Sequence, residues 1–376
     1  MTNTDRYSQH FISPEQFDIT KKKPLFGPNG WILFVACNSG IQLGQDVKNE
    51  YQRMLRENNS ELKEVPLLGT NQNPITSIFE DSETCPRLSC HVAGSNAYVF
   101  QCVHENISGN SVNENIQQLL QVIRTLRAHR AQTITVVTPY APYSRQDKPT
   151  FMQREATHFR LFVDQLKISG ADNHLTYHPH ALSLYGLYEP DMKVIALSGL
   201  DLFIDVFSFL KNQPNTVVVS TDSGGAKFTI HYAEAMNLSH AIGNKFRSKK
   251  DETQMIGIIG DMENKEKAII TDDETVTGSS FLNVVKALHH KYGIKEIYAA
   301  ITHMKIRKHH ISKLIEAHQQ HGLVQLHVTD SIPPLEEIRQ LDFIHIHSLA
   351  QRFASTINRL HYNQSVSEVF YDLKNK

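Results

Sequence analysis

The chain has 376 residues, which is enough for two domains of roughly 150 residues that each bury their own core. Hydrophobic residues make up 40% of the chain and charged residues 20%, so the composition excludes the disordered and fibrous classes. The formal net charge of -1 excludes a global basic field, and we therefore expect no nucleic-acid or membrane partner.

The cysteines and the N-terminal residues predict the compartment. Four cysteines lie in or beside apolar segments without C-x-x-C spacing, which is typical of buried thiols rather than disulfides or zinc ligands. They are Cys37, Cys85, Cys90 and Cys102. The first residues, MTNTDRYSQHF, contain no apolar stretch of signal-peptide length. We predict a cytoplasmic protein.

The first half of the chain alternates between strand and helix patterns. Residues 1–30 are polar and read as an N-terminal extension, and the apolar run from Trp31 to Cys37 is the first predicted strand. Further strands are expected at 77–79, 97–102, 134–137 and 175–177, and helices at 43–56, 113–130 and 156–168. Residues 31–196 are the first predicted domain.

The second half repeats the alternation. Strands are expected at 216–220, 255–259, 267–271 and 296–302, and helices at 200–211, 226–236 and 279–292. Residues 197–347 are the second predicted domain, and a helix at 348–360 opens a C-terminal segment, 348–376, that packs back on the body. Strand and helix alternation predicts an α/β fold of two doubly wound parallel-sheet domains, whose functional loops follow the carboxyl ends of strands.

The segment from Ile269 to Ser280, IITDDETVTGSS, has the pattern of a phosphate-binding loop. A buried strand is expected to end at Asp272 and Asp273, and Thr277 to Ser280 opens the next helix. The free N–H groups and the dipole of a helix N-terminus attract anions. The two carboxylates suit ribose hydroxyls or water on a magnesium ion, although an acidic pair before a helix is often only a cap.

Two other loops follow predicted strands. VVVSTDSGGAK, from Val217 to Lys227, sets Asp222 before two glycines, which favour a tight turn and close approach of a ligand but also simple helix packing. VVTPYAPYSRQDKP, from Val136 to Pro149, concentrates Arg145 and Gln146 with other charged groups, which suit a nucleotide triphosphate. For the loop from Val136 to Pro149, the alternative is an ordinary charged loop exposed to solvent.

Two histidines and a basic segment complete the candidates. His178 and His180 follow a short strand at a spacing that aims both imidazoles to one side of an extended chain, either as a divalent-ion site or as a hydrogen-bonded pair. Lys245 and Arg247 in NKFRSKKDE share one face of an extended segment. Such a cationic arm neutralises transferring phosphates, whereas an ordinary charge run is only solvated surface.

Taken in order, these motifs resemble the ribose-phosphate pyrophosphokinases from about residue 31 to 372. The ribose-phosphate loop by itself is similar to that of the type I phosphoribosyltransferases, so the resemblance implies two domains of that kind. FEDSETCPRL, from Phe79 to Leu88, is similar to the family's adenine-contacting F-x-[ND]-x-E segment. The family transfers the β,γ-diphosphate of ATP to the anomeric hydroxyl of ribose 5-phosphate, which gives phosphoribosyl pyrophosphate and AMP.

The resemblance implies a role for each motif. Lys245 and Arg247 are the implied catalytic residues, and His180 and Asp222 are the implied ligands of the Mg²⁺ cofactor. ATP contacts are implied for Arg145 and Gln146. They are also implied for Phe79, Asp81 and Glu83, which would reach the ATP bound in a neighbouring subunit. Ribose 5-phosphate contacts are implied for Arg247, Asp272, Asp273, Val276, Thr277, Gly278, Ser279 and Ser280. A site shared between subunits implies a homo-oligomer, either a dimer or a hexamer.

The sequence departs from the family pattern at several positions. His178 stands where the family has an aspartate, and Val276 stands where an acidic residue precedes T-G. The usual T-G-G-T ends here in Ser279 and Ser280, and R-x-P-I-[ST]-A-K appears only as REATHFR. These departures keep open a catalytically weak paralogue that regulates an active synthetase. The shared ribose-phosphate loop keeps open a phosphoribosyltransferase.

Overall fold

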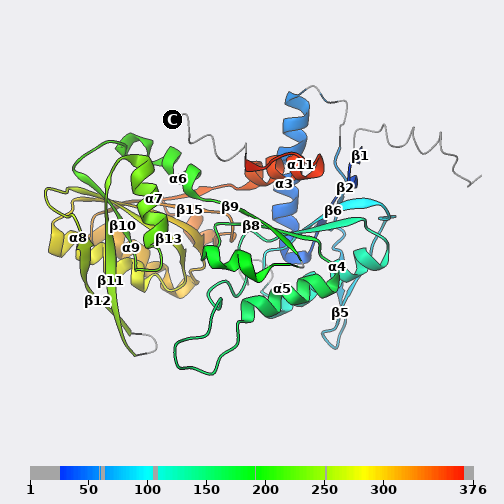
Figure 1. Cartoon of the computed structure of the whole chain (residues 1–376), viewed down its shortest axis with the longest axis horizontal. Coiled ribbons are helices and arrows are strands. Elements are labelled where there is room, and N and C mark those ends of the chain that lie inside the picture. The colour runs from blue at the N-terminus through cyan, green and yellow to red at the C-terminus, as the bar shows by residue number, and fades with distance from the viewer. Residues whose placement is uncertain are drawn as a thin grey trace, which may run out of the picture.

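The computed structural model describes residues 26–58, 60, 64–104, 109–190, 192–249 and 252–367, without the side chains of 245–249 and 252–256. Two main sheets lie next to each other along the long axis of the molecule, one built from each half of the chain (Figure 1). A separate two-stranded hairpin projects from the first half. The predicted α/β fold is confirmed.

The first sheet is doubly wound. Its strands are β1 (Phe26–Gly27), β2 (Gly30–Ala36), β3 (Leu67–Leu68), β6 (Ser95–Phe100), β7 (Thr133–Val137), β8 (Asn173–Tyr177) and β9 (Lys193–Leu197). The order is β1-β2-β6-β7-β8-β9, with β3 also paired to β2, and every pair except β1 with β2 is parallel. A strand that is covered on both faces is buried along its length, and all six residues of β6 are buried, including the polar Ser95 and Asn96.

Three helices cover this sheet: α3 (Ile41–Glu57), α4 (Val112–Ala128) and α5 (His158–Ser169). Ser111 and Glu114 form a capping box that starts α4, in which each side chain accepts a hydrogen bond from the other residue's backbone N–H. Gly170 ends α5 at φ 113°, a conformation that L side chains rarely adopt. At both helices, the capping residues therefore support the helix that the 3.6-residue period of apolar residues predicts.

The second sheet is also doubly wound. Its strands are β10 (Thr216–Ser220), β11 (Ser239–Lys249), β12 (Glu252–Gly260), β13 (Lys267–Thr275), β14 (Glu296–Met304), β15 (Leu323–Thr329) and β16 (Ile344–His347). They lie in the order β12-β11-β10-β13-β14-β15-β16, and β12 alone among the described strands of this sheet runs antiparallel to its neighbour. The chain order reverses between β10 and β13, which is where ligands bind in open α/β sheets.

The helices of the second half are α6 (Leu200–Val206), α7 (Ala226–Met236), α8 (Ser279–Tyr292), α9 (Ile311–Gln320) and α10 (Glu336–Arg339). The bounds of α7 and α8 coincide with those predicted from the sequence. Asn237 and Gly293 end these two helices in the left-handed conformation. The apolar faces of α8 and α9 share one core with β13, β14 and β15.

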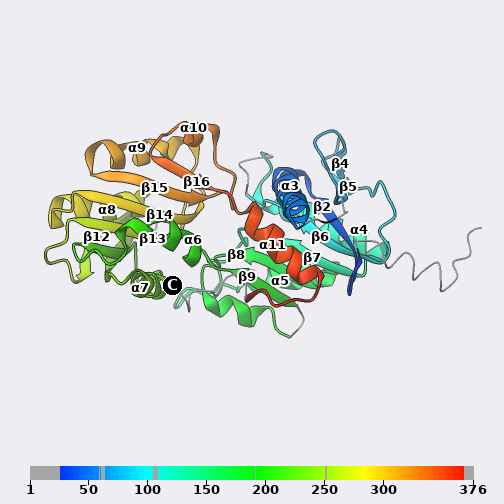
Figure 2. The same ribbon diagram turned by 90° about the horizontal axis from the view of Figure 1, so that it is seen from above.

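The last described helix, α11 (Ala350–His361), returns to the first half and lies across α3 (Figure 2). Asn358 donates a hydrogen bond to the Tyr51 hydroxyl at 3.0 Å, and the Asn96 amide lies 3.1 Å from His361 Nδ1. Phe353 packs edge-on against Tyr177 at the end of β8. One hydrophobic core runs from the first sheet through α11 to the second sheet, so the two halves are packed together.

Several expected boundaries are corrected. Phe26 and Gly27, expected in the extension, pair with β2 as a sheet strand, while residues 1–25 lie outside the described part of the chain. The strand expected at 77–79 is β4 (Thr76–Ile78), which among the described strands pairs only with β5 (Thr84–Pro86) in the separate hairpin. The short strand β3 takes the place beside β2 because its two leucines meet Phe34 and Val35.

Cysteine burial agrees with expectation at two positions. Cys37 and Cys102 are buried, and burial raises the pKa of the Cys102 thiol to about 12. Cys90 is exposed and Cys85 is half-buried, contrary to the expectation that all four thiols lie in the core. Within the described ranges, no helix has both the length and the apolarity to cross a membrane.

His174 on β8 predicts how stability depends on pH. Burial lowers the pKa of His174 from 6.5 to about 3, and its ring lies 2.6 Å from Thr138 Oγ1 and 2.7 Å from the Tyr188 hydroxyl. The native state therefore holds a neutral ring, whereas the unfolded chain takes up a proton as the pH falls below 6.5. We expect the free energy of unfolding to fall by on the order of 3 kcal/mol between pH 6.5 and 4 from this residue.

Urea titrations at several pH values measure this effect. His174→Gln keeps hydrogen-bonding groups and removes the titration, so its stability should depend less on pH in this range than that of the unaltered chain. His231→Gln is the matched control, because the side chain of His231 is 70% exposed. If the free energy of unfolding falls with pH to the same extent in His174→Gln and in the unaltered chain, His174 does not cause the loss of stability in acid.

Candidate active site at the carboxyl ends of the strands

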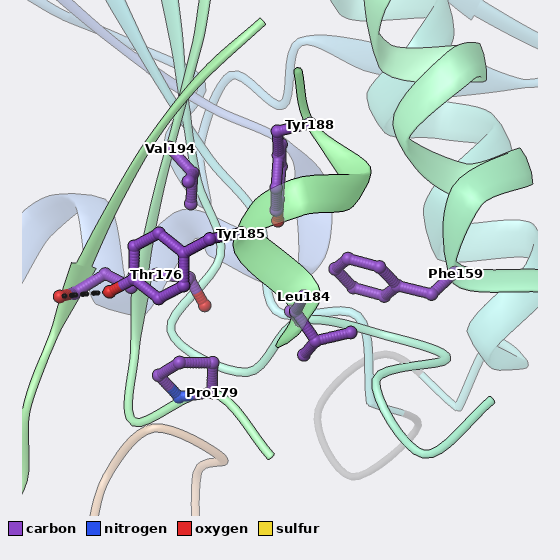
Figure 3. Close-up of a pocket in the computed structure, with 9 residues that line it drawn as sticks. Phe159, Thr176, Pro179, Leu184, Tyr185, Tyr188 and Val194 are labelled. Atoms are coloured by element: carbon purple, nitrogen blue, oxygen red, sulfur yellow. Dashed lines mark hydrogen bonds between the residues drawn. The ribbon is translucent and has the colours of Figure 1, made fainter. Parts of the chain in front are cut away.

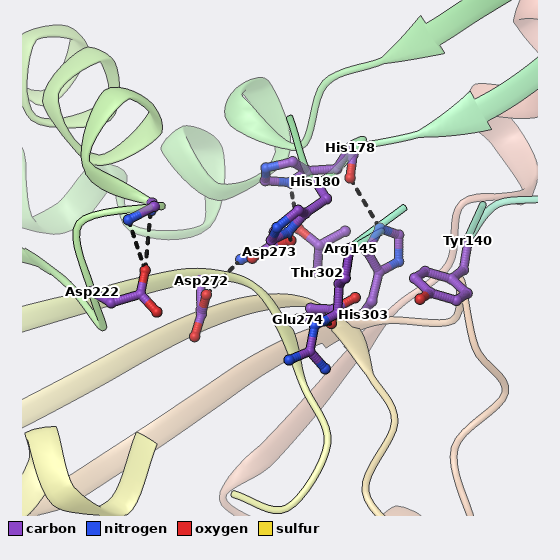
Figure 4. Close-up of polar contacts among 12 residues, drawn as sticks. Tyr140, Arg145, His178, His180, Asp222, Asp272, Asp273, Glu274, Thr302 and His303 are labelled. Carbon is purple, nitrogen blue, oxygen red and sulfur yellow. Dashed lines mark hydrogen bonds and ion pairs between the residues drawn. The ribbon is translucent and has the colours of Figure 1, made fainter. Parts of the chain in front are cut away.

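The polar residues of the candidate site come from both halves of the chain (Figure 4). Asp222 follows β10, and Asp272, Asp273 and Glu274 belong to the neighbouring strand β13. The loop after β8 brings His180 from the first half to the same place. The order reversal between β10 and β13 places Asp222 beside the acidic residues of β13, and the packing of the two halves adds His180, which lies 93 positions before Asp273 in the sequence.

The acidic pair lies within β13, because the strand extends to Thr275 instead of ending before Asp272. Strand alternation aims neighbouring side chains to opposite faces. Asp272 Oδ2 accepts a hydrogen bond from Thr221 Oγ1 at 2.6 Å, whereas Asp273 Oδ2 lies 2.5 Å from His180 Nδ1. The two carboxylates therefore meet different partners.

A hydrogen bond joins His180 and Asp273 across the two halves. The hydrogen bond to Asp273 raises the pKa of His180, although burial opposes this shift. Burial by itself raises the pKa of Asp273, but the hydrogen bond and charge of His180 outweigh it and hold that pKa below its ordinary range. Because Nδ1 faces the carboxylate, the ring orientation is fixed and Nε2 is the nitrogen that remains for a ligand.

Asp222 shapes the turn that follows β10. Its Oδ1 accepts the backbone N–H of Gly224 at 2.9 Å and that of Gly225 at 3.4 Å, and Ser220 Oγ donates to its carbonyl at 2.8 Å. Gly225 precedes the first residue of α7. The carboxylate therefore caps this turn with one oxygen.

His178 does not share a face with His180. The strand β8 ends at Tyr177, and His178 has a φ of 44°, so the alternation of an extended chain stops there. His178 is buried, its Nδ1 lies 2.6 Å from Thr302 Oγ1, and burial lowers its pKa to about 4. The expected pair of imidazoles on one side is therefore wrong, and His178 is a neutral residue in the contact between the halves.

The loop that carries these histidines rests on a closed apolar cluster (Figure 3). Pro179, Leu184 and Tyr188 border a cavity of about 10 Å³, which is close to the space needed by one water molecule. Tyr185 donates a hydrogen bond to the carbonyl of Ala196 at 3.3 Å. This space holds no substrate, and the cluster serves to support the loop.

Glu274 connects two cations. Lys305 Nζ donates to Glu274 Oε2 at 2.7 Å and to the Tyr140 hydroxyl at 2.9 Å. Arg145 Nε lies 3.2 Å from Glu274 Oε1. Arg145 is thereby brought to the site although its side chain is exposed, as is that of Gln146 beside it.

The expected phosphate cradle has the geometry of an anion site with an additional cation. Gly278 has a φ of 68° and precedes α8, which begins at Ser279. A β-carbon on Gly278 would lie within 4 Å of the side chains of Ile306 and Lys313. Lys313 Nζ, from α9, donates to Ser279 Oγ at 2.6 Å and to the Thr277 carbonyl at 3.2 Å. Lys313 therefore adds a positive charge at the N-terminus of α8.

Other expected residues of this loop have different surroundings. Val276 is 37% exposed, so an apolar side chain faces solvent where an acidic one was expected. Ser280 lies in the first turn of α8 and is half-buried. Thr277 Oγ1 lies 3.4 Å from the backbone N–H of Ser279, which satisfies one of the free donors at the helix start.

Three expected ATP contacts lie away from this site. Phe79, Asp81 and Glu83 form the tip of the β4–β5 hairpin, where Phe79 is 46% exposed. The backbone N–H of Glu83 donates to Asp81 Oδ1 at 3.1 Å, and Ser82 has a φ of 72°. The hairpin projects away from the second half in both views (Figures 1 and 2). The chain thus does not bring these residues to its own Asp222 and His180.

The expected catalytic arm is an antiparallel strand pair. Lys245 pairs with Met255 and Arg247 with Thr253, and the register shifts at both ends of this stretch. An irregular register re-aims side chains along a strand. The side chains of Lys245 and Arg247 lie outside the described residues.

The described side chains form no preassembled metal cage, since none of their groups of three or more His, Cys, Asp or Glu suits an ion. Mg²⁺ usually keeps several waters and binds through one or two protein groups together with substrate phosphates. Asp222 provides a carboxylate beside an ordered turn, and His180 provides a nitrogen whose orientation Asp273 fixes. These residues fit a magnesium ion that is held jointly with a substrate.

Three residues of the site carry no distinguishing pattern in the sequence. Glu274 lies inside the phosphate-loop motif, but nothing in the pattern set it apart from the two aspartates. Lys305 directly follows β14 and Lys313 lies on α9, and basic residues at such positions are equally common on solvated surfaces. Only their contacts, which join separate parts of the chain, reveal their place in the site.

Comparisons with known proteins agree with this arrangement. Residues 33–170 match the model of the N-terminal domain of ribose phosphate pyrophosphokinase. The chain is 31% identical over 295 residues to a ribose-phosphate pyrophosphokinase of Clostridium acetobutylicum, which covers 78% of this chain and 88% of that protein. It is 32% identical over 292 residues to the one from Caldanaerobacter subterraneus, with the same two coverages.

A solved structure extends the comparison to the fold. The phosphoribosylpyrophosphate synthetase of Mycobacterium smegmatis superimposes with a TM-score of 0.71 at 23% identity. The match covers 88% of this chain and 99% of the other. The sequence identity to the two curated relatives carries the assignment, and the structural match confirms the fold. The chain therefore belongs to the ribose-phosphate pyrophosphokinase family.

Proposed function

We propose that the protein is a ribose-phosphate diphosphokinase, which makes phosphoribosyl pyrophosphate and AMP from ATP and ribose 5-phosphate. The observation that carries the proposal is the site itself. Asp222, His180, Asp273 and the N-terminus of α8 meet at the reversal between β10 and β13 in a chain of this family. Arg145 reaches the same place from the first half.

Each group has a distinct role in the proposed reaction. The cradle from Thr277 to Ser280 binds the 5-phosphate of ribose, and Asp272 and Asp273 orient the sugar hydroxyls. Arg145 holds ATP phosphates through its planar guanidinium. The anomeric hydroxyl attacks the β-phosphorus and AMP leaves, so the diphosphate is transferred whole. Catalysis rests on positioning and charge neutralisation.

Lys245 and Arg247 are the proposed catalytic cations. Their strand pair lies next to β10, and β11 continues past the carboxyl end of that strand. Donors aimed at charge that develops in the transition state lower the barrier most in a water-excluded site. Asp222 and His180 would hold Mg²⁺, which would supply positive charge to neutralise the phosphates.

A shared site supports two further proposals. Phe79, Asp81 and Glu83 at the hairpin tip would contact the adenine of a neighbouring subunit, which makes the protein a homo-oligomer of at least two copies. We propose that residues 31–196 and 197–347 act as the two domains of each copy, with 348–376 packed against the body. The reduced cysteines support a cytoplasmic location.

One assay tests the proposed activity. Purified protein is incubated with ATP, ribose 5-phosphate and Mg²⁺, and AMP and phosphoribosyl pyrophosphate are quantified together. Equal amounts of both products are expected, because the diphosphate moves as one unit. Absence of both products across divalent metals and added phosphate would reject the activity.

The exposed Val276 supports a second candidate function, a weakly active paralogue that regulates an active synthetase. A loop that carries an apolar group where the family has an acidic one lacks one contact to the ribose. The same assay separates the two, since a regulatory paralogue would bind ATP without forming either product. Consumption of phosphoribosyl pyrophosphate with a nucleobase would instead indicate a phosphoribosyltransferase.

Lys313→Met tests the 5-phosphate cradle. The substitution keeps most of the side-chain volume over Gly278 and removes the charge near Ser279. We expect KM for ribose 5-phosphate to rise about tenfold with little change in KM for ATP, as for the loss of one charge-assisted hydrogen bond. Lys286→Met on the same helix pair is the control, because Lys286 pairs with Glu316. Equal KM values for ribose 5-phosphate in Lys313→Met and the unaltered chain would remove Lys313 from the cradle.

A further inference from the structure

A buried ion cluster joins the two halves of the chain at the candidate ATP loop. Tyr140 and Arg145 come from the loop after β7, while Glu274 belongs to β13 and Lys305 follows β14. The side chains of Glu274 and Lys305 are only 6% and 8% exposed. The side chain of Arg145, in contrast, is 51% exposed. The cluster thus has a buried base and an accessible guanidinium.

Lys305 secures the base of the cluster. Its ammonium donates to Glu274 Oε2 at 2.7 Å and to the Tyr140 hydroxyl at 2.9 Å, and it lies 4.3 Å from the centroid of the Tyr140 ring. A buried carboxylate is costly unless it is paired and hydrogen-bonded. Lys305 therefore pairs with the Glu274 carboxylate and holds its side chain in one orientation.

The other carboxylate oxygen faces Arg145. Arg145 Nε lies 3.2 Å from Glu274 Oε1, and no described residue donates an aligned hydrogen bond to that oxygen. Figure 4 shows the two terminal nitrogens of Arg145 pointing away from Glu274. The positive charge of Arg145 balances the negative charge on Glu274 Oε1, while the two terminal nitrogens of the guanidinium face outward.

This arrangement suits recognition of a phosphate. The two terminal nitrogens of a guanidinium form the edge that binds phosphate oxygens bidentately. A long arginine side chain loses rotamer freedom when it binds a ligand, and a partner that already fixes it lowers that cost. An ion pair that restrains the guanidinium at Nε therefore raises affinity, although the carboxylate does not contact the ligand.

We propose that Glu274, held by Lys305, is a positioning residue that orients Arg145 toward the phosphates of ATP. The inference rests on the proposed function, in which Arg145 contacts ATP. It adds that a residue inside the ribose 5-phosphate loop sets affinity for the other substrate.

The test is a double-mutant cycle on ATP binding. Glu274→Gln combined with Lys305→Met removes both buried charges together, so neither is left unpaired, and the chain is expected to fold. Arg145→Ala is made in the unaltered chain and in this double variant. Calorimetry measures the Kd of α,β-methylene-ATP with Mg²⁺, which reports binding without turnover.

The proposal expects the effects to be strongly non-additive. Arg145→Ala should weaken binding about tenfold in the unaltered chain, and the Glu274→Gln/Lys305→Met variant should weaken it by a similar factor. Arg145→Ala should then add less than about threefold in that variant, because the arginine is no longer oriented. Asp201→Asn, which breaks an ion pair with Arg352 at 2.9 Å, is the control for stability and should leave Kd unchanged.

The outcomes separate the two proposals. If Arg145→Ala costs the same factor in both backgrounds, Glu274 does not position Arg145, and the inference fails while the proposed function stands. If the unaltered chain does not bind α,β-methylene-ATP, the proposed function fails, and the inference fails with it.

Discussion

Lys245→Ala is expected to lower kcat by about 10²–10³-fold, because the lysine is proposed to neutralise charge that develops on the transferring diphosphate. An interaction made only in the transition state lowers kcat without weakening the ground-state complex. The KM for ATP and the Kd of α,β-methylene-ATP should therefore change little. Initial rates of AMP formation, measured together with calorimetric binding, give both quantities.

Lys267→Ala is the matched control for this substitution. Lys267 begins β13, at the end of the strand opposite to the acidic residues, and its ammonium lies 3.4 Å from Glu296. Its removal should leave kcat within about twofold, as for most exposed ion pairs. If Lys245→Ala instead weakens ATP binding as much as it slows turnover, Lys245 is a binding residue and has no special role in the transition state.

Asp222→Asn is expected to lower kcat/KM by about 100-fold and to raise the Mg²⁺ concentration needed for half-maximal rate. The asparagine oxygen can still accept the Gly224 N–H at the position of Oδ1, so the turn before α7 is preserved. The substitution therefore removes a negative charge and little else. Activity as a function of Mg²⁺ at fixed ATP measures the effect.

Two further variants separate the metal role from the capping role. Asp222→Ala removes both, and it should additionally lower stability, because Gly224 and Gly225 lose their acceptor. Asp261→Asn changes an exposed carboxylate that pairs with Lys265, and it should leave the Mg²⁺ dependence unchanged. An unchanged Mg²⁺ dependence in Asp222→Asn would remove Asp222 from the metal site.

The fold was largely predictable because its signals are local. β10, α7 and α8 occur at the predicted residues, since continuous apolar runs and a 3.6-residue period are properties of short windows. The strand β16, with the sequence IHIH, was not predicted, because its two histidines stack with His327 inside the sheet and have no apolar signature. Contacts with residues that are distant in the sequence determine the structure of this strand.

The site was predictable only in part, for the same reason. The quoted motifs contain Asp222, His180, Asp273 and the residues of the cradle, and the fold brings these together. The prediction that His178 and His180 lie on one side of an extended chain was wrong. The backbone of His178 has a φ of 44°, and its imidazole is buried in the interior. The link between Arg145 and Glu274 spans the two halves, and no spacing rule predicts such a contact.

The sequence by itself determined the two doubly wound sheets, the loops that follow their strands, and the cradle at the start of α8. These depend on periodicity, chain order and the residue types of a few adjacent positions. Only the tertiary structure decided that Asp273 faces His180, that Lys313 joins the cradle, and that Glu274 pairs with Arg145. Packing of the halves through α11 and their shared core sets the first and third of these contacts, and packing of α9 against α8 sets the second, so each depends on elements that are distant in the sequence.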